Sequence, residues 1–147
     1  MRKILPVFLI CLVMAMGRGT SVAQTASPSN KTAAPSDAQK VFDQMKTLAG
    51  SWQGTVMGIP INVTIRLASS DTAILYEATT EGGRPPNHEI TMFYLEGDRL
   101  LATHYCDGGN RARFEGKSSP DGKTSEFNFL DVTGNTRGGL VKRMLFT

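Results

Sequence analysis

The sequence has few of the residues that build disulfides, metal clusters or catalytic centres. It contains two cysteines, two histidines and one tryptophan in 147 residues. Cys11 falls in an N-terminal apolar run, so Cys106 is the only cysteine of the remaining chain and has no intramolecular disulfide partner there. Paired-cysteine zinc spacings, serine nucleophile motifs, phosphate-binding loops and internal repeats are all missing. The composition therefore argues against most enzyme classes that short motifs identify.

A hydrophobic run long enough to span a bilayer is also missing. Arg2 and Lys3 precede an apolar run over residues 4–16, which is shorter than the roughly 20 apolar residues that a membrane helix needs. Small residues up to Ala23 then provide a cleavage site. The pattern predicts a signal peptide over residues 1–23, cleaved near Ala23. We therefore expect an exported protein, periplasmic or secreted, with no membrane span after cleavage.

A surplus of charge of either sign is absent once the signal peptide has been removed. The whole chain has 16 basic and 13 acidic residues, of which three basic and no acidic residues lie in the first 23. The remaining 124 residues are therefore neutral, with 13 charges of each sign. Neutrality removes the electrostatic case for a nucleic acid or an anionic membrane surface as partner. The oligomeric state stays open.

The remaining chain divides into a short tether and one domain. Residues 24–35 are mostly Ser, Thr, Ala, Pro and Asn without an aromatic residue, which predicts a disordered tether. Ser36 is followed by Gln39 at the spacing of a capping box, and apolar residues at helical spacing come next. We expect a helix over residues 37–48 within a domain over residues 36–147.

After this helix the apolar residues follow the period of β-strands. Short runs of this kind are separated by turn residues, with no helix between them, which predicts an all-β, antiparallel up-and-down meander. About eight strands would form a barrel, with the short helix against one open end. The chain stops at Thr147 within an apolar run, which leaves open a barrel that is incomplete at its C-terminal edge. The expected strands are 51–57, 61–67, 72–80, 88–95, 100–106, 111–117, 123–132 and 140–146.

The segment 88–106 predicts the clearest hairpin. Gly97-Asp98 can supply the positive φ of a two-residue turn, so Leu95 faces Leu100 and Tyr94 faces Leu101. Because side chains alternate along a strand, one face has Ile90, Met92, Tyr94, Leu101, Thr103 and Tyr105. The other face has Glu89, Thr91, Phe93, Leu95, Leu100, Ala102, His104 and Cys106.

The predicted pairing of the next strands indicates which face of the sheet is the interior. Four-residue turns at 107–110 and 119–122 would place Tyr105 opposite Ala112 and Phe114 opposite Phe127. The aromatic side chains of four strands then lie on the same face as Tyr105. We predict that this face is the interior and that the face of His104, with Arg113 opposite it, points mostly to solvent.

The aromatic interior is the first candidate site. A barrel of about eight strands is either filled by side chains or just large enough for one small ligand, so an ordinary packed core is the alternative. Tyr94 and Tyr105 favour a ligand, because a buried phenol needs a hydrogen-bond partner. The candidate ligand-binding residues are Trp52, Met92, Tyr94, Tyr105, Phe114, Phe127 and Phe129.

A second candidate lies on the opposite face. Glu89, His104 and Cys106 could supply a carboxylate, an imidazole and a thiolate to a metal ion. A cluster of ordinary polar residues is the favoured alternative, since a fourth ligand is missing. A direct Cys-His proton transfer is not expected, because residues two apart on a strand lie roughly 6.5 Å from each other.

The entry into the first strand resembles a known group of barrels. Leu48-Ala49-Gly50-Ser51-Trp52-Gln53-Gly54 is similar to the Gly-x-Trp start of calycins, which include lipocalins, fatty-acid-binding proteins and nitrobindin-like proteins. The segment from His88 to Asn110 also resembles exported bacterial proteins with lipocalin-like barrels. The resemblance implies that Trp52 closes one barrel end, and it supplies no activity. It does not imply haem, because the late histidine of nitrobindin-like proteins has no counterpart here.

These observations favour an exported, non-enzymatic protein that binds a small, largely apolar molecule inside a lipocalin-like barrel. No cofactor is expected. Two alternatives stay open: a metal- or haem-dependent enzyme that uses His104 and Cys106, and a structural or interaction domain without a ligand.

Overall fold

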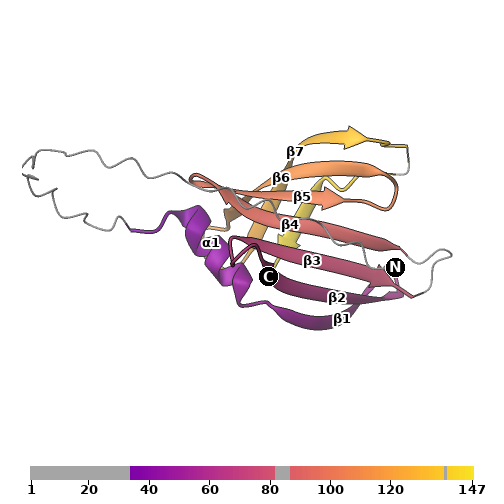
Figure 1. Ribbon diagram of the computed structural model, residues 1–147, viewed down its shortest axis with the longest axis horizontal. Helices are drawn as coiled ribbons and strands as arrows, with labels where there is room; N and C mark the ends of the chain where they lie inside the picture. Colours follow the sequence, from indigo (N-terminus) through magenta and orange to yellow (C-terminus); the bar gives the residue numbers. More distant parts are fainter. Residues whose placement is uncertain (1–33, 82–86, 138) are drawn as a thin grey trace, which may run out of the picture. The chain divides into compact units, whose positions relative to one another are not determined.

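The computed structural model describes residues 34–81, 87–137 and 139–147. The expected signal peptide and all but the last two residues of the expected tether lie outside these ranges. The described chain forms a helix and eight strands (Figure 1). These elements are α1 (Asp37–Lys46), β1 (Gly50–Val56), β2 (Ile59–Ala68), β3 (Ala73–Thr80), β4 (His88–Glu96), β5 (Arg99–Tyr105), β6 (Asn110–Ser118), β7 (Ser125–Gly134) and β8 (Arg143–Phe146).

The helix α1 begins at the predicted cap. The Ser36 hydroxyl accepts a hydrogen bond from the Gln39 backbone N–H at 3.2 Å, which satisfies one of the free donors of the first turn. The helix ends two residues before the predicted end, because the N–H of Leu48 bonds to the carbonyl three residues back. Its buried side chains, Val41, Phe42 and Met45, pack towards β4, β5 and β6. Across the described ranges, no helix has the length and hydrophobicity of a membrane span.

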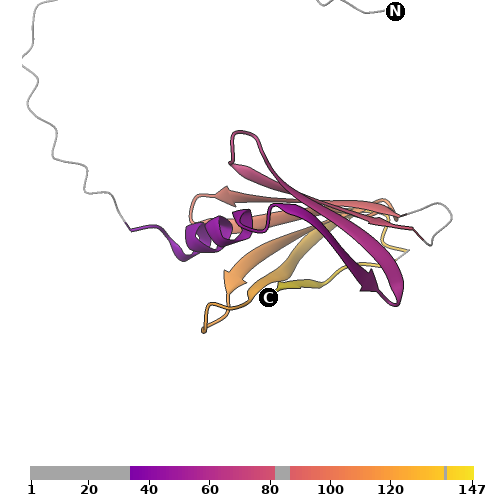
Figure 2. The ribbon, with the colours of Figure 1, turned by 90° about the horizontal axis from the view of Figure 1, so that it is seen from below.

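The strands form one sheet in chain order, and every neighbouring pair is antiparallel. The sheet curls into a half-barrel with α1 at one end (Figure 2). The predicted all-β meander with one short helix is therefore confirmed. β1 and β8 are the two edges, and β8 pairs only with residues 125–128 of β7.

The predicted register of the β4–β5 hairpin is confirmed, but its faces are inverted. Leu95 pairs with Leu100 and Tyr94 with Leu101. His104 is nevertheless only 6% exposed, whereas Tyr105 is 43% exposed. The inner face of the sheet, the one covered by α1 and β8, therefore carries Glu89, Thr91, Phe93, Leu95, Leu100, Ala102, His104 and Cys106.

The inversion comes from the turn between β5 and β6. Tyr105 pairs with Arg111 rather than with the predicted Ala112. The turn holds one residue fewer than predicted, three instead of four, and the Cys106 N–H closes it by bonding to the Asn110 carbonyl at 3.0 Å. Because side chains alternate, this one-residue difference moves each β6 side chain to the other face relative to β5. Ala112 lies opposite His104, and the Arg111 side chain shares the outer face with Tyr105.

The β6–β7 register also differs from the prediction, although its aromatic face is inside as expected. Phe114 pairs with Phe129, and Phe127 pairs with Gly116, because Ser118 pairs with Ser125 across a turn that is two residues longer than predicted. A β-bulge between Arg113 and Phe114 then shifts the register of the remaining pairs. Phe114 and Phe127 are fully buried. With Phe93 and Phe42 from neighbouring elements, they form the centre of the core. Phe127 packs edge-on against Phe93, with ring centroids 5.0 Å apart.

Gly116 leaves the space that the Phe127 ring fills. A Cβ at residue 116 would lie 2.6 Å from Cε1 of Phe127 and 3.0 Å from Cδ2 of Leu100. We therefore expect Gly116→Ala to lower the free energy of unfolding by about 1–3 kcal/mol, the usual cost of overpacking. Chemical denaturation monitored by circular dichroism measures this change.

Gly54→Ala is the matched control, because it adds the same methyl group to another strand glycine. Its Cβ would meet the Ile61 side chain at an ordinary 3.7 Å, and we expect a change within about 0.5 kcal/mol. Equal destabilisation by the two substitutions would contradict the packing described around Gly116.

Candidate functional site

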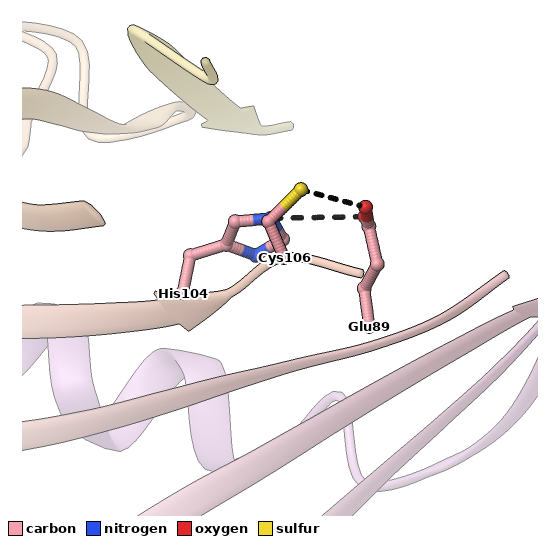
Figure 3. A group of neighbouring side chains, drawn as sticks. All are labelled: Glu89, His104 and Cys106. Carbon is pink, nitrogen blue, oxygen red and sulfur yellow. Dashed lines mark hydrogen bonds and ion pairs between the residues drawn. The ribbon is translucent and has the colours of Figure 1, made fainter. Parts of the chain in front are cut away.

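The described polar groups of the inner face meet at one end of β4 and β5. Glu89 and Thr91 lie two residues apart on β4, and His104 lies on β5 directly opposite Thr91. Cys106 follows β5 by one residue. Because alternate residues share a face, all four side chains come together. Figure 3 shows Glu89, His104 and Cys106. This Glu89–His104–Cys106 cluster, with Thr91 beneath the imidazole, is the candidate functional site.

His104 is held by one hydrogen bond and is free at its other ring nitrogen. Nδ1 lies 2.9 Å from the Thr91 hydroxyl. Nε2 is buried, has no hydrogen-bond partner in the described part of the chain, and lies 3.7 Å from a Glu89 carboxylate oxygen. Burial lowers the pKa of His104, and the nearby Glu89 carboxylate only partly opposes this shift. The imidazole is therefore neutral at neutral pH.

Cys106 is a half-buried free thiol. Its Sγ donates a hydrogen bond to Glu89 Oε1 at 3.4 Å and accepts one from the Gly108 backbone N–H at 3.4 Å. Burial raises the pKa of the Cys106 thiol, and the Glu89 carboxylate adds to this effect. The thiol is thus protonated in the free protein, where it is a poor nucleophile.

A Cys-His nucleophilic dyad is not supported by this geometry. The thiol gives its hydrogen bond to Glu89, and the free nitrogen of His104 makes none. The donor atoms of the three residues do lie within 4.8 Å of one another. This is the distance range of side chains that share one ion, so the structure brings the three predicted metal-ligating residues together.

Arg113 does not belong to this site. The sequence placed it opposite His104, but it pairs with Thr103 on the outer face of the sheet. There its Nε donates to Asp131 Oδ1 at 2.8 Å. No cation from the outer face of β6 therefore neutralises Glu89.

The predicted ligand-binding residues are divided among three places. Phe114, Phe127 and Phe129 belong to the packed core or its margin. Met92, Tyr94 and Tyr105 lie on the outer face, so the prediction that they line the interior is wrong. Trp52 lies on β1, half exposed, and its Nε1 donates to the Leu48 carbonyl at 2.9 Å.

Sequence reasoning missed three residues that accompany the cluster. Tyr76 and Ala78 lie on β3 beside Thr91 and Glu89. The carboxylate of Glu89 and partial burial raise the pKa of Tyr76, with burial the larger cause. Val63, on β2, pairs with Ala78 of β3. The even alternation of apolar residues over 61–67 was the signal for Val63, but it could not show which residues of β3 and β4 lie beside it.

Asn110 supports the turn that carries Cys106. It is 1% exposed, its Nδ2 donates to the Gly139 carbonyl at 3.1 Å, and its Oδ1 has no partner among the residues that the structure describes. The backbone of this residue also closes the β5–β6 turn. Asn110 therefore fixes the position of Cys106 relative to the C-terminal segment.

A separate cleft of about 630 Å³ opens beside α1, away from the cluster. Charged side chains of both signs line it, including Asp37, Lys40, Arg99 and Glu115. Arg99 and Glu115 pair with each other at 3.0 Å. Such a lining does not fit a largely apolar molecule, so the cleft is not the better candidate.

No family model, curated protein or solved structure matches the chain. The resemblance to calycins therefore rests on the residues around Trp52 and on the segment from His88 to Asn110. The function has to be argued from the inner face itself.

Thr91 is 2% exposed and supplies the observed hydrogen bond of His104. In metal-free buffer we expect Thr91→Val to lower the free energy of unfolding by about 1–3 kcal/mol, because it leaves a buried imidazole nitrogen unpaired. Chemical denaturation with a chelator present measures the loss. Thr64→Val, at an exposed position of β2, is the control, with an expected change within about 0.5 kcal/mol. Similar losses for both variants would contradict the role given to Thr91.

Proposed function

We propose that the protein is an exported binding protein that holds a small, largely apolar molecule on the inner face of the half-barrel. One observation carries the proposal. A single line of residues crosses the strands of this face and changes from apolar to polar along its length. This line, the binding row, consists of Trp52, Val63, Ala78, Glu89 and Cys106.

The pairing of the strands defines the binding row. Trp52 pairs with Val63, Val63 with Ala78, and Ala78 with Glu89. Cys106 completes it through its hydrogen bond to Glu89. Trp52 is 50% exposed, and most of the row is partly accessible. A partly exposed aromatic and aliphatic surface that ends in a few polar groups is the usual composition of a small-molecule site.

The polar end of the row indicates what the ligand carries. The Glu89 carboxylate accepts hydrogen bonds, and no Arg or Lys of the described ranges pairs with it. A hydroxyl or amide of the ligand can donate to it, whereas a ligand carboxylate would be repelled. The proposal is therefore a molecule with an apolar body and a neutral, hydrogen-bond-donating end.

The lack of catalytic geometry supports binding over catalysis. The Cys106 thiol is protonated, and its hydrogen bond goes to a carboxylate rather than to the imidazole. Export follows from the expected signal peptide over residues 1–23 and forms part of the same proposal.

Trp52 is the only tryptophan of the chain, so its fluorescence reports on the binding row directly. We expect dodecanol to change the Trp52 emission, and dodecanoate to bind at least about fivefold more weakly. The repulsion between two carboxylates about 4 Å apart is about 1 kcal/mol in bulk water and about 4 kcal/mol near a protein surface. Glu89→Gln should reduce the difference between the two probes, as measured by fluorescence titration at neutral pH with a chelator present.

Val63→Ser should weaken dodecanol binding, whereas Met92→Ser, a change on the outer face, should leave it unchanged. Retinol and haem extend the set of probes. Should none of these molecules alter the Trp52 emission or bind in equilibrium dialysis, the binding proposal fails. A structural or interaction domain would then be the remaining interpretation.

A further inference from the structure

We propose that Glu89, His104 and Cys106 form a binding site for a divalent transition-metal ion, with Zn²⁺ as the best match. The site does not depend on the proposed apolar ligand, and it is tested with the metal alone. Within the described ranges, these residues are the only group of three His, Cys, Asp or Glu side chains close enough to share one ion.

The donor atoms have the separations that a small metal ion requires. Zn²⁺ binds sulfur at about 2.3 Å and imidazole nitrogen or carboxylate oxygen at about 2.0–2.2 Å. In a tetrahedral site, these bonds place neighbouring donors about 3.3–3.6 Å apart. The distance from Glu89 Oε1 to Cys106 Sγ is 3.4 Å, and that from Glu89 Oε2 to His104 Nε2 is 3.7 Å. All the donors lie within 4.8 Å of one another, so small side-chain movements complete the geometry.

The buried nitrogen of His104 is an independent indication of a ligand. His104 is 6% exposed, and its Nε2 faces Glu89 without a hydrogen bond. When Nδ1–H donates to the Thr91 hydroxyl, Nε2 presents a lone pair to a negatively charged carboxylate. A cation between the two groups turns this repulsion into two favourable bonds.

The surroundings of the cluster suit a metal ion as well. Thr91 fixes the ring orientation of His104, and the Gly108 N–H donates to Cys106 Sγ. Such outer hydrogen bonds orient the ligands of metal sites. When the metal binds, the Cys106 thiol releases its proton to solvent and forms a metal–sulfur bond. The two negative ligand charges of Glu89 and the Cys106 thiolate then balance the two positive charges of the ion.

The proposed site keeps one coordination position for water or a small molecule. Three protein ligands leave the fourth tetrahedral position open. Glu89 and Cys106 are only partly buried, so this position faces the accessible part of the binding row. His104 provides the buried side of the site.

The experiment titrates the chelator-treated full chain with Co²⁺ and then with Zn²⁺. A Co²⁺ ion bound to a thiolate gives an absorption band from sulfur-to-metal charge transfer. We expect one Co²⁺ per chain with this band, and its loss when Zn²⁺ displaces the cobalt. Wild-type protein that shows neither the band nor one-to-one Zn²⁺ binding by calorimetry would overturn the proposal.

The chain contains its own matched controls, because it has two cysteines and two histidines. Cys106→Ser should abolish the charge-transfer band, whereas Cys11→Ser should preserve it. His104→Gln should weaken Zn²⁺ binding strongly, whereas His88→Gln should not. The His88 side chain is 53% exposed, its Nε2 lies 3.6 Å from a Glu77 carboxylate oxygen, and it does not belong to the cluster.

Two further variants separate metal ligation from a structural role. Glu89→Gln keeps the size of the side chain but removes its charge, and it should weaken Zn²⁺ binding. Thr91→Val should lower the affinity by about 10–100-fold while keeping the charge-transfer band, as expected for a positioning residue. Circular dichroism in chelator confirms which variants are folded. Zn²⁺ binding that is unchanged in folded Cys106→Ser and Glu89→Gln proteins would place the metal elsewhere and refute the proposed site.

Discussion

The pairing of β5 with β6 determines which half of the sheet's side chains is buried. A shift of one residue would expose Ala112 and Phe114 and turn Arg111 and Arg113 inwards. Burying one large apolar side chain contributes about 1.5–3 kcal/mol, while an unpaired buried guanidinium costs several kcal/mol. Both effects select the observed register. Glu89, Thr91 and His104 occupy the same alternate positions as the buried apolar residues of β4 and β5. Their polar groups therefore lie on the inner face as well.

Burying a neutral histidine lowers the stability of the fold unless both ring nitrogens make hydrogen bonds. His104 meets half of this requirement through Thr91. The other nitrogen, Nε2, faces the Glu89 carboxylate, and no hydrogen bond joins the two groups. An apolar side chain at either position would remove this cost without changing the register. Folding alone does not require this polar pair, which supports the proposed occupant of the site.

Local signals in the sequence predicted local structure well. The Ser36 cap, the Gly97-Asp98 turn and the pairing of Leu95 with Leu100 are all present. The alternation within β6 was also interpreted correctly, with Phe114 and Arg113 on opposite faces. The turn between β5 and β6 was not predicted correctly, because Cys-Asp-Gly-Gly-Asn fits a turn of three or four residues equally well. Since the faces of β4 and β5 were assigned through the aromatics of β6 and β7, this error inverted the assignment of Tyr105 and His104.

The inner face has two regions with different roles. Near the β4–β5 and β6–β7 turns, α1 covers it, and Phe42, Phe114 and Phe127 exclude water. At the opposite ends of β4 and β5, the face stays accessible at Glu89 and Cys106. Stability comes from the first region, where any ligand would have to displace close-packed aromatic rings. The proposed recognition is placed in the second region, because within the described ranges polar groups, an unpaired imidazole nitrogen and solvent access occur together there.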